Sequence, residues 1–235
     1  MTFKLATALF SALALLGCRS APVQPPPVGV YTLVLIRTGP NDGTLDADAR
    51  RAAFAGHFAN MERMAQERQL LLAGPYGATK HAGDLRGLFV LDTSDLDEAA
   101  QWAASDPTTQ SGVFVLEHHT LATAMPLGEM LEAELDRLAE LEAAGATPQP
   151  GQNARAWVLL TAEHGDVARR ELEPLVSPDG GVFLLGELDG ERLWAVLDAR
   201  DAAQARERFA PELAAMGAHT LDDWFATDLI AMLVR

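Results

Sequence analysis

Two side chains in the first half of the chain are of the types that form an acid–base pair. His57 lies on the apolar face of a predicted helix at residues 47–68, and Asp106 follows a second predicted helix at residues 93–105. A carboxylate hydrogen-bonded to imidazole fixes its tautomer and favours the cation, which makes histidine an acid or base near neutral pH. The alternative interpretation is a core histidine whose partner is an aspartate that caps a helix.

A short turn and an arginine are candidates for ligand binding. Gly74, Pro75 and Tyr76 follow a predicted strand, where the backbone would turn at a pocket rim and the Tyr76 hydroxyl could donate to a ligand. The alternative there is a plain turn. Arg37 ends the first predicted strand, where it could attract an anionic substrate or simply lie at the surface.

Motifs for metals, nucleotides and nucleic acid are not favoured. Glu117, His118 and His119 are metal-ligand types, but adjacent side chains of a strand point to opposite faces, so the histidines cannot easily share one ion. The sequence has no CxxC, HExxH, Walker, GxGxxG or GxSxG motif. We therefore expect no metal and no cofactor. The net charge of −15 argues against nucleic acid, because phosphate binding requires a basic face.

The N-terminus has the pattern of a secretory signal, with Lys4 before an apolar run at residues 5–16 and small residues after it. The lone cysteine, Cys18, ends a Leu-Leu-Gly-Cys stretch that resembles the lipobox of bacterial lipoproteins. That resemblance implies cleavage before Cys18, a lipid on its thiol and a membrane anchor. Arg19 stands where some inner-membrane lipoproteins have aspartate, which favours the outer membrane. The alternative is an ordinary signal peptide with an incidental cysteine.

The region after a proline-rich tether at residues 18–29 predicts a first folded unit. Strands are expected at residues 30–37, 69–73, 85–91 and 112–117, because these runs are β-branched or apolar and are bounded by loop residues. With the two helices, their order is β-α-β-β-α-β, the split βαβ or ferredoxin-like arrangement. One face of such a sheet carries the helices, and the other face must be covered.

This unit resembles the YCII-related family over roughly residues 30–121. The segments that carry the resemblance are His57, Leu72-Ala73-Gly74-Pro75, Gly87-Leu88-Phe89-Val90, Ser105-Asp106-Pro107 and Gly112-Val113-Phe114. The resemblance implies the dimeric α/β-barrel form of the ferredoxin-like fold, in which two sheets meet face to face. It also implies that His57 and Asp106 correspond to the paired His and Asp proposed as the family's active site. Relatives on the same fold include muconolactone isomerases and a chloromuconolactone dehalogenase.

The second half repeats the pattern loosely. A helix at residues 130–144 and a flexible linker at 145–153 precede a diverged second copy, with strands expected at 156–161, 182–186, 192–198 and 226–234. Its first predicted helix carries no histidine, because His164 precedes that helix. Ala210-Pro211 stands near the position of Asp106-Pro107, so the second copy lacks the pair.

Together these features predict an α+β chain of two tandem ferredoxin-like halves that form an intrachain, barrel-like pseudo-dimer. The expected divisions are a signal peptide at 1–17, a tether at 18–29, a YCII-like domain at 30–125, a helix and linker at 126–153 and a second domain at 154–235. The expected place is the cell envelope, anchored in the outer membrane and facing the periplasm. Two functions stay open: an isomerase, lyase or hydrolase acting on a small organic substrate, or a non-catalytic ligand-binding or scaffolding module.

Overall fold

The computed structural model describes residues 29–147, 149 and 151–234. The predicted signal peptide at 1–17, Cys18 and all of the predicted tether except Gly29 lie outside the described residues. The elements of the first half are β1 (Gly29–Thr38), α1 (Ala47–Gln66), β2 (Leu70–Pro75), β3 (Leu85–Leu91), α2 (Leu96–Ala104), α3 (Pro107–Gln110) and β4 (Phe114–Thr123).

Aspartates begin the helices of the first half. Asp46 accepts hydrogen bonds from two backbone N–H groups at the start of α1, and Asp95 does the same at α2. Asp106 caps α3, a one-turn helix that the sequence did not predict, with Pro107 in its first turn. Such carboxylates satisfy N–H groups that have no partner within the helix and interact favourably with the helix dipole.

The strand β2 differs from the prediction. Gly74 and Pro75 were expected to form a turn, but they continue β2 and pair with Leu88 and Gly87 of β3. Proline is tolerated because it stands at the last position of the strand, where a missing N–H disrupts the ladder least. Tyr76 follows directly and forms an isolated bridge with Trp224 of the second half.

The elements of the second half are α4 (Leu127–Ala143), β5 (Ala154–Ala162), α5 (Gly165–Leu172), the 3₁₀ helix η1 (Glu173–Leu175), β6 (Val182–Leu188), β7 (Arg192–Leu197), α6 (Ala202–Arg208), α7 (Ala210–Met216), β8 (His219–Thr227) and the 3₁₀ helix η2 (Asp228–Val234). The prediction of a closing strand at residues 226–234 was wrong. The closing strand is β8, whose polar residues include the buried Asp222, and the apolar end of the chain is η2 instead.

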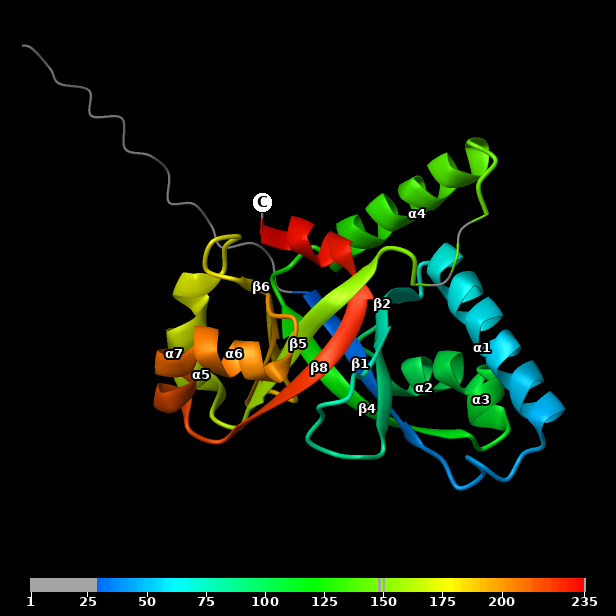
Figure 1. Cartoon of the computed structure of the whole chain (residues 1–235), viewed down its shortest axis with the longest axis horizontal. Helices are drawn as coiled ribbons and strands as arrows, with labels where there is room; N and C mark the ends of the chain where they lie inside the picture. Colours follow the sequence, from blue (N-terminus) through cyan, green and yellow to red (C-terminus); the bar gives the residue numbers. More distant parts are fainter. Residues whose placement is uncertain (1–28, 148, 150, 235) are drawn as a thin grey trace, which may run out of the picture.

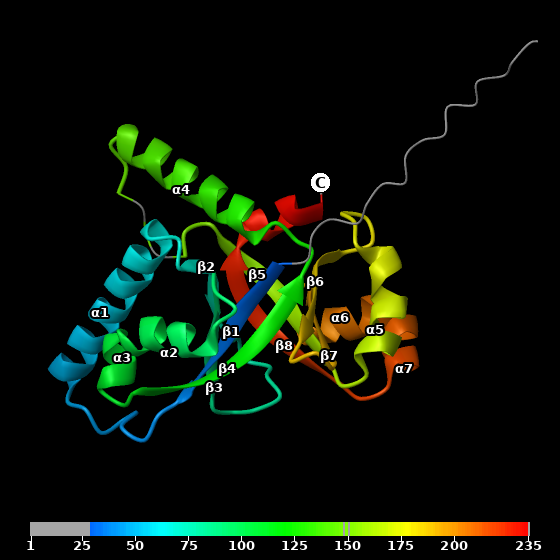
Figure 2. The same cartoon turned by 180° about the vertical axis from the view of Figure 1, so that it is seen from behind.

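The eight strands of the described residues form one antiparallel sheet in the order β2-β3-β1-β4-β6-β7-β5-β8, which curls into a nearly closed barrel (Figures 1 and 2). The halves join at two seams. At the first, β4 pairs with β6, with Thr123 opposite Gly186. At the second, the end of β2 meets β8, where the Gly77 N–H donates to the Asp223 carbonyl over 2.7 Å. The chain is therefore a mixed α+β structure built on a barrel-like sheet.

Apolar side chains fill three layers. The barrel interior contains buried residues from both halves, including Leu33, Leu121, Trp157 and Trp224. The helices α1, α2 and α3 cover the outer face of the first four strands, and α5, α6 and α7 cover the last four on the opposite side of the barrel (Figure 1). His57 lies in the first of these outer layers, against Phe89 and Phe114, and not inside the barrel.

The helix α4 lies outside the barrel and projects from it beside η2 (Figure 1). Its first turns are anchored by buried Leu127, Met130 and Leu131, while its far end is mostly exposed. Within residues 29–147, 149 and 151–234, no helix combines the length and the apolar character needed to cross a membrane.

Candidate acid–base site

His57 and Asp106 meet between α1 and α3. The Nδ1 atom of His57 lies 2.7 Å from Oδ2 of Asp106. The helix α1 brings the histidine to its buried face together with Ala53 and Met64. Asp106 is the N-cap residue of α3, and this position places its carboxylate at the start of α3, under α1. Residues far apart in the chain are thus held in hydrogen-bonding distance by two helices.

Asp106 is fixed on both of its oxygens. Its Oδ1 accepts hydrogen bonds from the Thr108 backbone N–H, over 2.9 Å, and from the Thr108 hydroxyl, while Oδ2 faces His57. Only 1% of the residue is exposed. Burial by itself raises the pKa of this carboxyl, but the hydrogen bonds from His57 and Thr108 outweigh burial and hold the pKa below its usual value. Asp106 is therefore an anion at neutral pH.

Four phenylalanine rings surround His57. Phe89 is stacked with the imidazole at a centroid distance of 6.0 Å, and Phe54, Phe58 and Phe114 meet it edge-on at 5.4–6.3 Å. Among the described residues, the Nε2 atom of His57 has no hydrogen-bond partner, and 11% of the histidine side chain is exposed. The ring is thus oriented by Asp106 on one nitrogen and available on the other.

This arrangement can carry out proton transfer. A carboxylate acceptor at Nδ1 holds the proton there, leaves Nε2 as the acceptor in the neutral ring and stabilises the imidazolium after protonation. The phenyl rings restrict water around the imidazole, which strengthens the interaction between the two groups. The same geometry also satisfies a structural role, because Asp106 caps α3 whether or not His57 transfers protons.

The other predicted binding residues lie elsewhere. Arg37 belongs to the face of β1 that points into the barrel, and it makes ion pairs with Glu117 at 2.7 Å and Asp84 at 3.1 Å. Its charge is therefore already balanced by two carboxylates. The structure does not bring Arg37 together with the His57–Asp106 pair, which lies on the outer side of the same sheet.

Gly74, Pro75 and Tyr76 lie at the second seam. An added Cβ at Gly74 would overlap the carbonyl oxygen of Phe225, so glycine lets β8 approach β2 closely. Tyr76 packs against the barrel-interior residues, and burial together with the nearby negative charge of Asp222 raises the pKa of its hydroxyl above its usual value. Tyr76 is a neutral phenol at the end of the barrel, on the other side of the sheet from His57.

Sequence reasoning missed several polar features. Thr108, which clamps Asp106, follows Asp-Pro at a helix start, and this capping pattern was the available signal. A second histidine–aspartate contact, 2.8 Å between Nδ1 of His81 and Oδ2 of Asp222, links a loop of the first half to β8. No sequence signal pointed to this contact. It joins residues of different halves, and the sequence does not show which residues of the two halves lie side by side.

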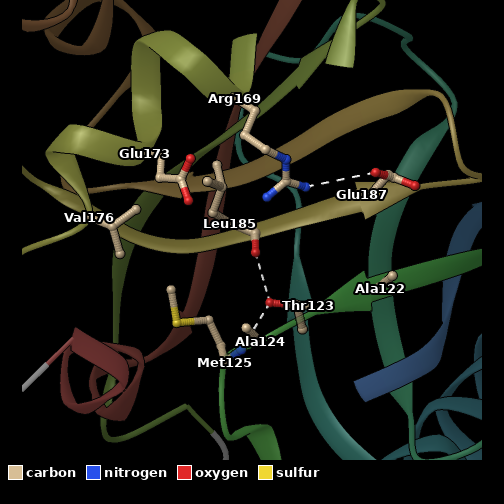
Figure 3. Close-up of a pocket in the computed structure, with 9 residues that line it drawn as sticks. All are labelled: Ala122, Thr123, Ala124, Met125, Arg169, Glu173, Val176, Leu185 and Glu187. Carbon is tan, nitrogen blue, oxygen red and sulfur yellow. Dashed lines mark hydrogen bonds and ion pairs between the residues drawn. The ribbon is translucent and has the colours of Figure 1, made fainter. Parts of the chain in front are cut away.

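A cavity of about 420 Å³ lies on the outer side of the first seam, between β4, β6 and α5 (Figure 3). Sequence analysis did not predict it. It is lined by Ala122, Thr123, Ala124, Met125, Arg169, Glu173, Val176, Leu185 and Glu187. Neither His57 nor Asp106 belongs to this lining. Its volume falls within the range of small-molecule sites in proteins.

Metal coordination is not provided within the part of the chain that the structure describes, where no three His, Cys, Asp or Glu side chains gather as ligands. His119 instead faces Asp189 of the β6–β7 turn, with its Nδ1 atom 2.8 Å from Oδ2. Burial lowers the pKa of the neighbouring His118.

The fold and the site together define a class of protein: an α+β barrel with a His–Asp pair on the outer side of its first four strands. Residues 30–118 match the model of the YCII-related domain. Among solved structures, the chain is similar to a protein from Lactobacillus acidophilus NCFM described as a candidate monooxygenase, at 11% identity and a TM-score of 0.46, covering 84% of this chain and 94% of that one. No curated protein matches the chain.

Proposed function

We propose that the YCII-related domain is an acid–base enzyme of the isomerase, lyase or hydrolase type that acts on a small organic substrate. The observation that carries the proposal is the 2.7 Å contact between Nδ1 of His57 and a buried, ionised Asp106. His57 is the acid or base and transfers protons at Nε2. Asp106 fixes the tautomer and stabilises the imidazolium, and Thr108 holds Asp106 in place.

A substrate that binds beside His57 would contact the phenyl ring of Phe58. Phe58 is 49% exposed although it lies within 5.4 Å of the imidazole. An exposed aromatic side chain beside the partly exposed imidazole supports an unsaturated or cyclic organic substrate, which could stack there while it exchanges a proton. This is the substrate class that the surroundings of Nε2 favour.

The test is turnover of a panel of unsaturated lactones and related acids in D₂O, followed by NMR for conversion or deuterium incorporation. A His57→Gln variant should lose about 10²- to 10⁴-fold in rate, the usual contribution of a positioned acid–base group. His164→Gln is the matched control, because His164 precedes the first helix of the second half and should leave the rate unchanged. Equal turnover by wild type and His57→Gln, or no turnover of any panel member, would contradict the proposal.

We also propose that the two halves are tandem ferredoxin-like units forming an intrachain pseudo-dimer. The support is that both halves follow the same order of strands, with β2-β3-β1-β4 matched by β6-β7-β5-β8, and that the two seams join equivalent strands. Each half thereby covers the apolar face of the other, which is what a second subunit would otherwise do. Light scattering should then give a monomer, and an obligate dimer of whole chains would count against the proposal.

Membrane attachment through Cys18 is a further proposal, supported only by the sequence pattern at residues 1–18. We expect lipidation of the Cys18 thiol and an outer-membrane location facing the periplasm. Fractionation of cells that express Cys18→Ser should show the protein in the soluble fraction. If that variant stays with the membrane, the anchor is not the cysteine.

A non-catalytic ligand-binding or scaffolding role in the envelope is the second candidate function. Two observations favour it: His57 is only 8% exposed, and the described cavity lies at another place in the fold. In that case Asp106 serves as the cap of α3 and His57 as its buried partner. The turnover panel separates the two functions. An enzyme converts a panel member and loses rate in His57→Gln, whereas a non-catalytic module converts none.

A further inference from the structure

The cavity at the first seam has a divided lining. Its floor is apolar and consists of Leu185 from β6, Val176 and Met125. Its charged residues are Arg169 and Glu173, which lie four residues apart, and Glu187 of β6 (Figure 3). Arg169 belongs to α5, and Glu173 begins η1 directly after it, so both side chains rise from the same side of this helical segment.

The charged side chains keep unused hydrogen-bonding capacity. The only ionic contact of Arg169 among the described residues is with Glu187 at 3.9 Å, which is too long for a hydrogen bond. The Glu173 carboxylate makes no hydrogen bond or ion pair within that part of the chain. Thr123, in contrast, is already satisfied, because its hydroxyl donates to the Leu185 carbonyl and accepts from the Met125 N–H. Recognition in this cavity therefore depends on one guanidinium and the carboxylates of Glu173 and Glu187 beside an apolar surface.

We propose that this cavity binds a free α-amino acid with an apolar side chain. The ligand carboxylate would take the two-pronged donor face of Arg169, the ammonium group would take Glu173, and the side chain would lie against Leu185, Val176 and Met125. Glu187 orients the guanidinium from the strand. A zwitterion suits the site better than either single charge, because an anion alone would meet two glutamates and a cation alone would meet Arg169.

This site is independent of the acid–base pair. Its lining comes from β4, the segment after β4, α5, η1 and the residue after it, and β6. His57 belongs to α1, which lies on the other side of the barrel (Figure 1). Both halves contribute to it, so the site exists only in the joined chain. Failure of the acid–base proposal would leave it unaffected.

The test is isothermal titration calorimetry of the full-length Cys18→Ser chain, which cannot carry an acyl group on this thiol, with L-leucine and three related probes. The compound 4-methylpentanoate lacks the ammonium group, 3-methylbutylamine lacks the carboxylate, and glycine lacks the side chain. Each should bind at least about tenfold more weakly than leucine, since each loses one charged hydrogen bond or the apolar contact. Equal binding of the amine or of the acid would overturn the proposal.

Substitutions assign the contacts. Arg169→Gln should weaken leucine binding by about tenfold or more without weakening 3-methylbutylamine, which loses a repulsive neighbour. Glu173→Gln should likewise weaken leucine without weakening 4-methylpentanoate. Arg170→Gln and Glu163→Gln are the matched controls, because both residues are exposed and outside the lining. Variants that behave like these controls would overturn the assignment.

A methyl label places the ligand. With ¹³C-labelled methionine methyl groups, leucine should shift the Met125 signal and not that of Met216, which is buried among the second-half helices. The titration should be unchanged in His57→Gln. A Met125 signal that does not move, or loss of binding in His57→Gln, would show that leucine does not occupy this cavity.

Discussion

The outer layers of the two halves differ in the position that precedes their last short helix. In the first half this position is Asp106, and in the second it is Phe209, and each is only 1% exposed. The polar residues His57, Asp106 and Thr108 are all buried in the first layer, whereas the buried residues of the second layer are apolar throughout the described part of the chain. The second layer is therefore packed as an apolar core, whereas the first layer contains the oriented carboxylate of Asp106 in place of an apolar side chain.

The first helix of each half differs in length and in the residues that it buries. The helix α1 has 20 residues and places His57 in the middle of its buried face, while α5 has 8 residues and buries only Ala168 and Leu172. The buried positions of α5 are apolar and pack in the same cluster as Phe209, so no polar side chain takes the place of His57 there. Two halves with the same strand order therefore retain the same barrel without retaining the same chemistry.

Removing the Phe209 ring should have the largest effect on stability. Phe209→Ala leaves a cavity among α6, α7 and the sheet, so the free energy of unfolding should fall by about 3–5 kcal/mol. Urea unfolding measures the change. Phe225→Ala, at a side chain that is 42% exposed, should cost much less, and equal losses would mean that Phe209 is not a core residue.

Asp106 should separate capping from pairing. Asp106→Ala removes both the α3 cap and the partner of His57, so the free energy of unfolding should fall by about 2–4 kcal/mol. Asp106→Asn keeps an oxygen for Thr108 and should cost clearly less while still disturbing His57. If both variants lose the same stability in thermal or urea unfolding, the cap contributes little and the pair accounts for the whole effect.

The two seams should differ in their tolerance of a methyl group. In Gly74→Ala the new carbon would meet the backbone of β8, so we expect a loss of about 1–3 kcal/mol. In Gly186→Ala it would lie 2.6 Å from Cδ1 of Leu121, a side-chain atom that can move, so the loss should be smaller. Chemical unfolding of the two variants side by side tests this order, and the reverse order would contradict the close approach at the second seam.

Acid should weaken the first layer. The pKa of Asp106 is lower in the folded protein than in the unfolded chain, so its contribution to stability is fully present above about pH 4 and is lost as the pH falls through the folded value. Unfolding measured between about pH 5 and pH 2 should show this loss in the wild type and a shallower dependence in Asp106→Asn. Identical pH profiles would mean that Asp106 is not ionised in the fold.

Much of the fold could be predicted from apolar runs and turn residues. The strands β1, β3 and β7 lie within about a residue of their expected ranges, because each is a dense β-branched or leucine-rich run. The strand β8 was missed because the closing strand was predicted in the apolar run at residues 226–234, while β8 itself carries Asp222 and Asp223. In the structure, Asp222 holds His81, and Asp223 accepts from the N–H groups of Thr79 and Ala202, so these charges have partners that the local sequence does not reveal.

The candidate site was predictable only in part. His57 was placed on a buried helix face by its spacing, but its contact with Asp106 depends on α3, a helix too short for periodicity to detect. Arg37 and Tyr76 were predicted as separate ligand-binding candidates, and the structure places both on the inner side of the sheet, away from the pair. Arg169 and Glu173 gave no signal, since the cavity they line forms only when the halves join.

The most direct measurement for the His57–Asp106 pair is a long-range ¹H–¹⁵N NMR spectrum of the His57 ring in the wild type and in Asp106→Asn. The geometry predicts a proton on Nδ1 in the wild type, held by the Asp106 carboxylate, and a changed Nδ1 signal in the variant. That result would leave Nε2 as the nitrogen that meets a substrate. A wild-type ring without a proton on Nδ1, or a spectrum that is unchanged in Asp106→Asn, would contradict the pair as an acid–base centre.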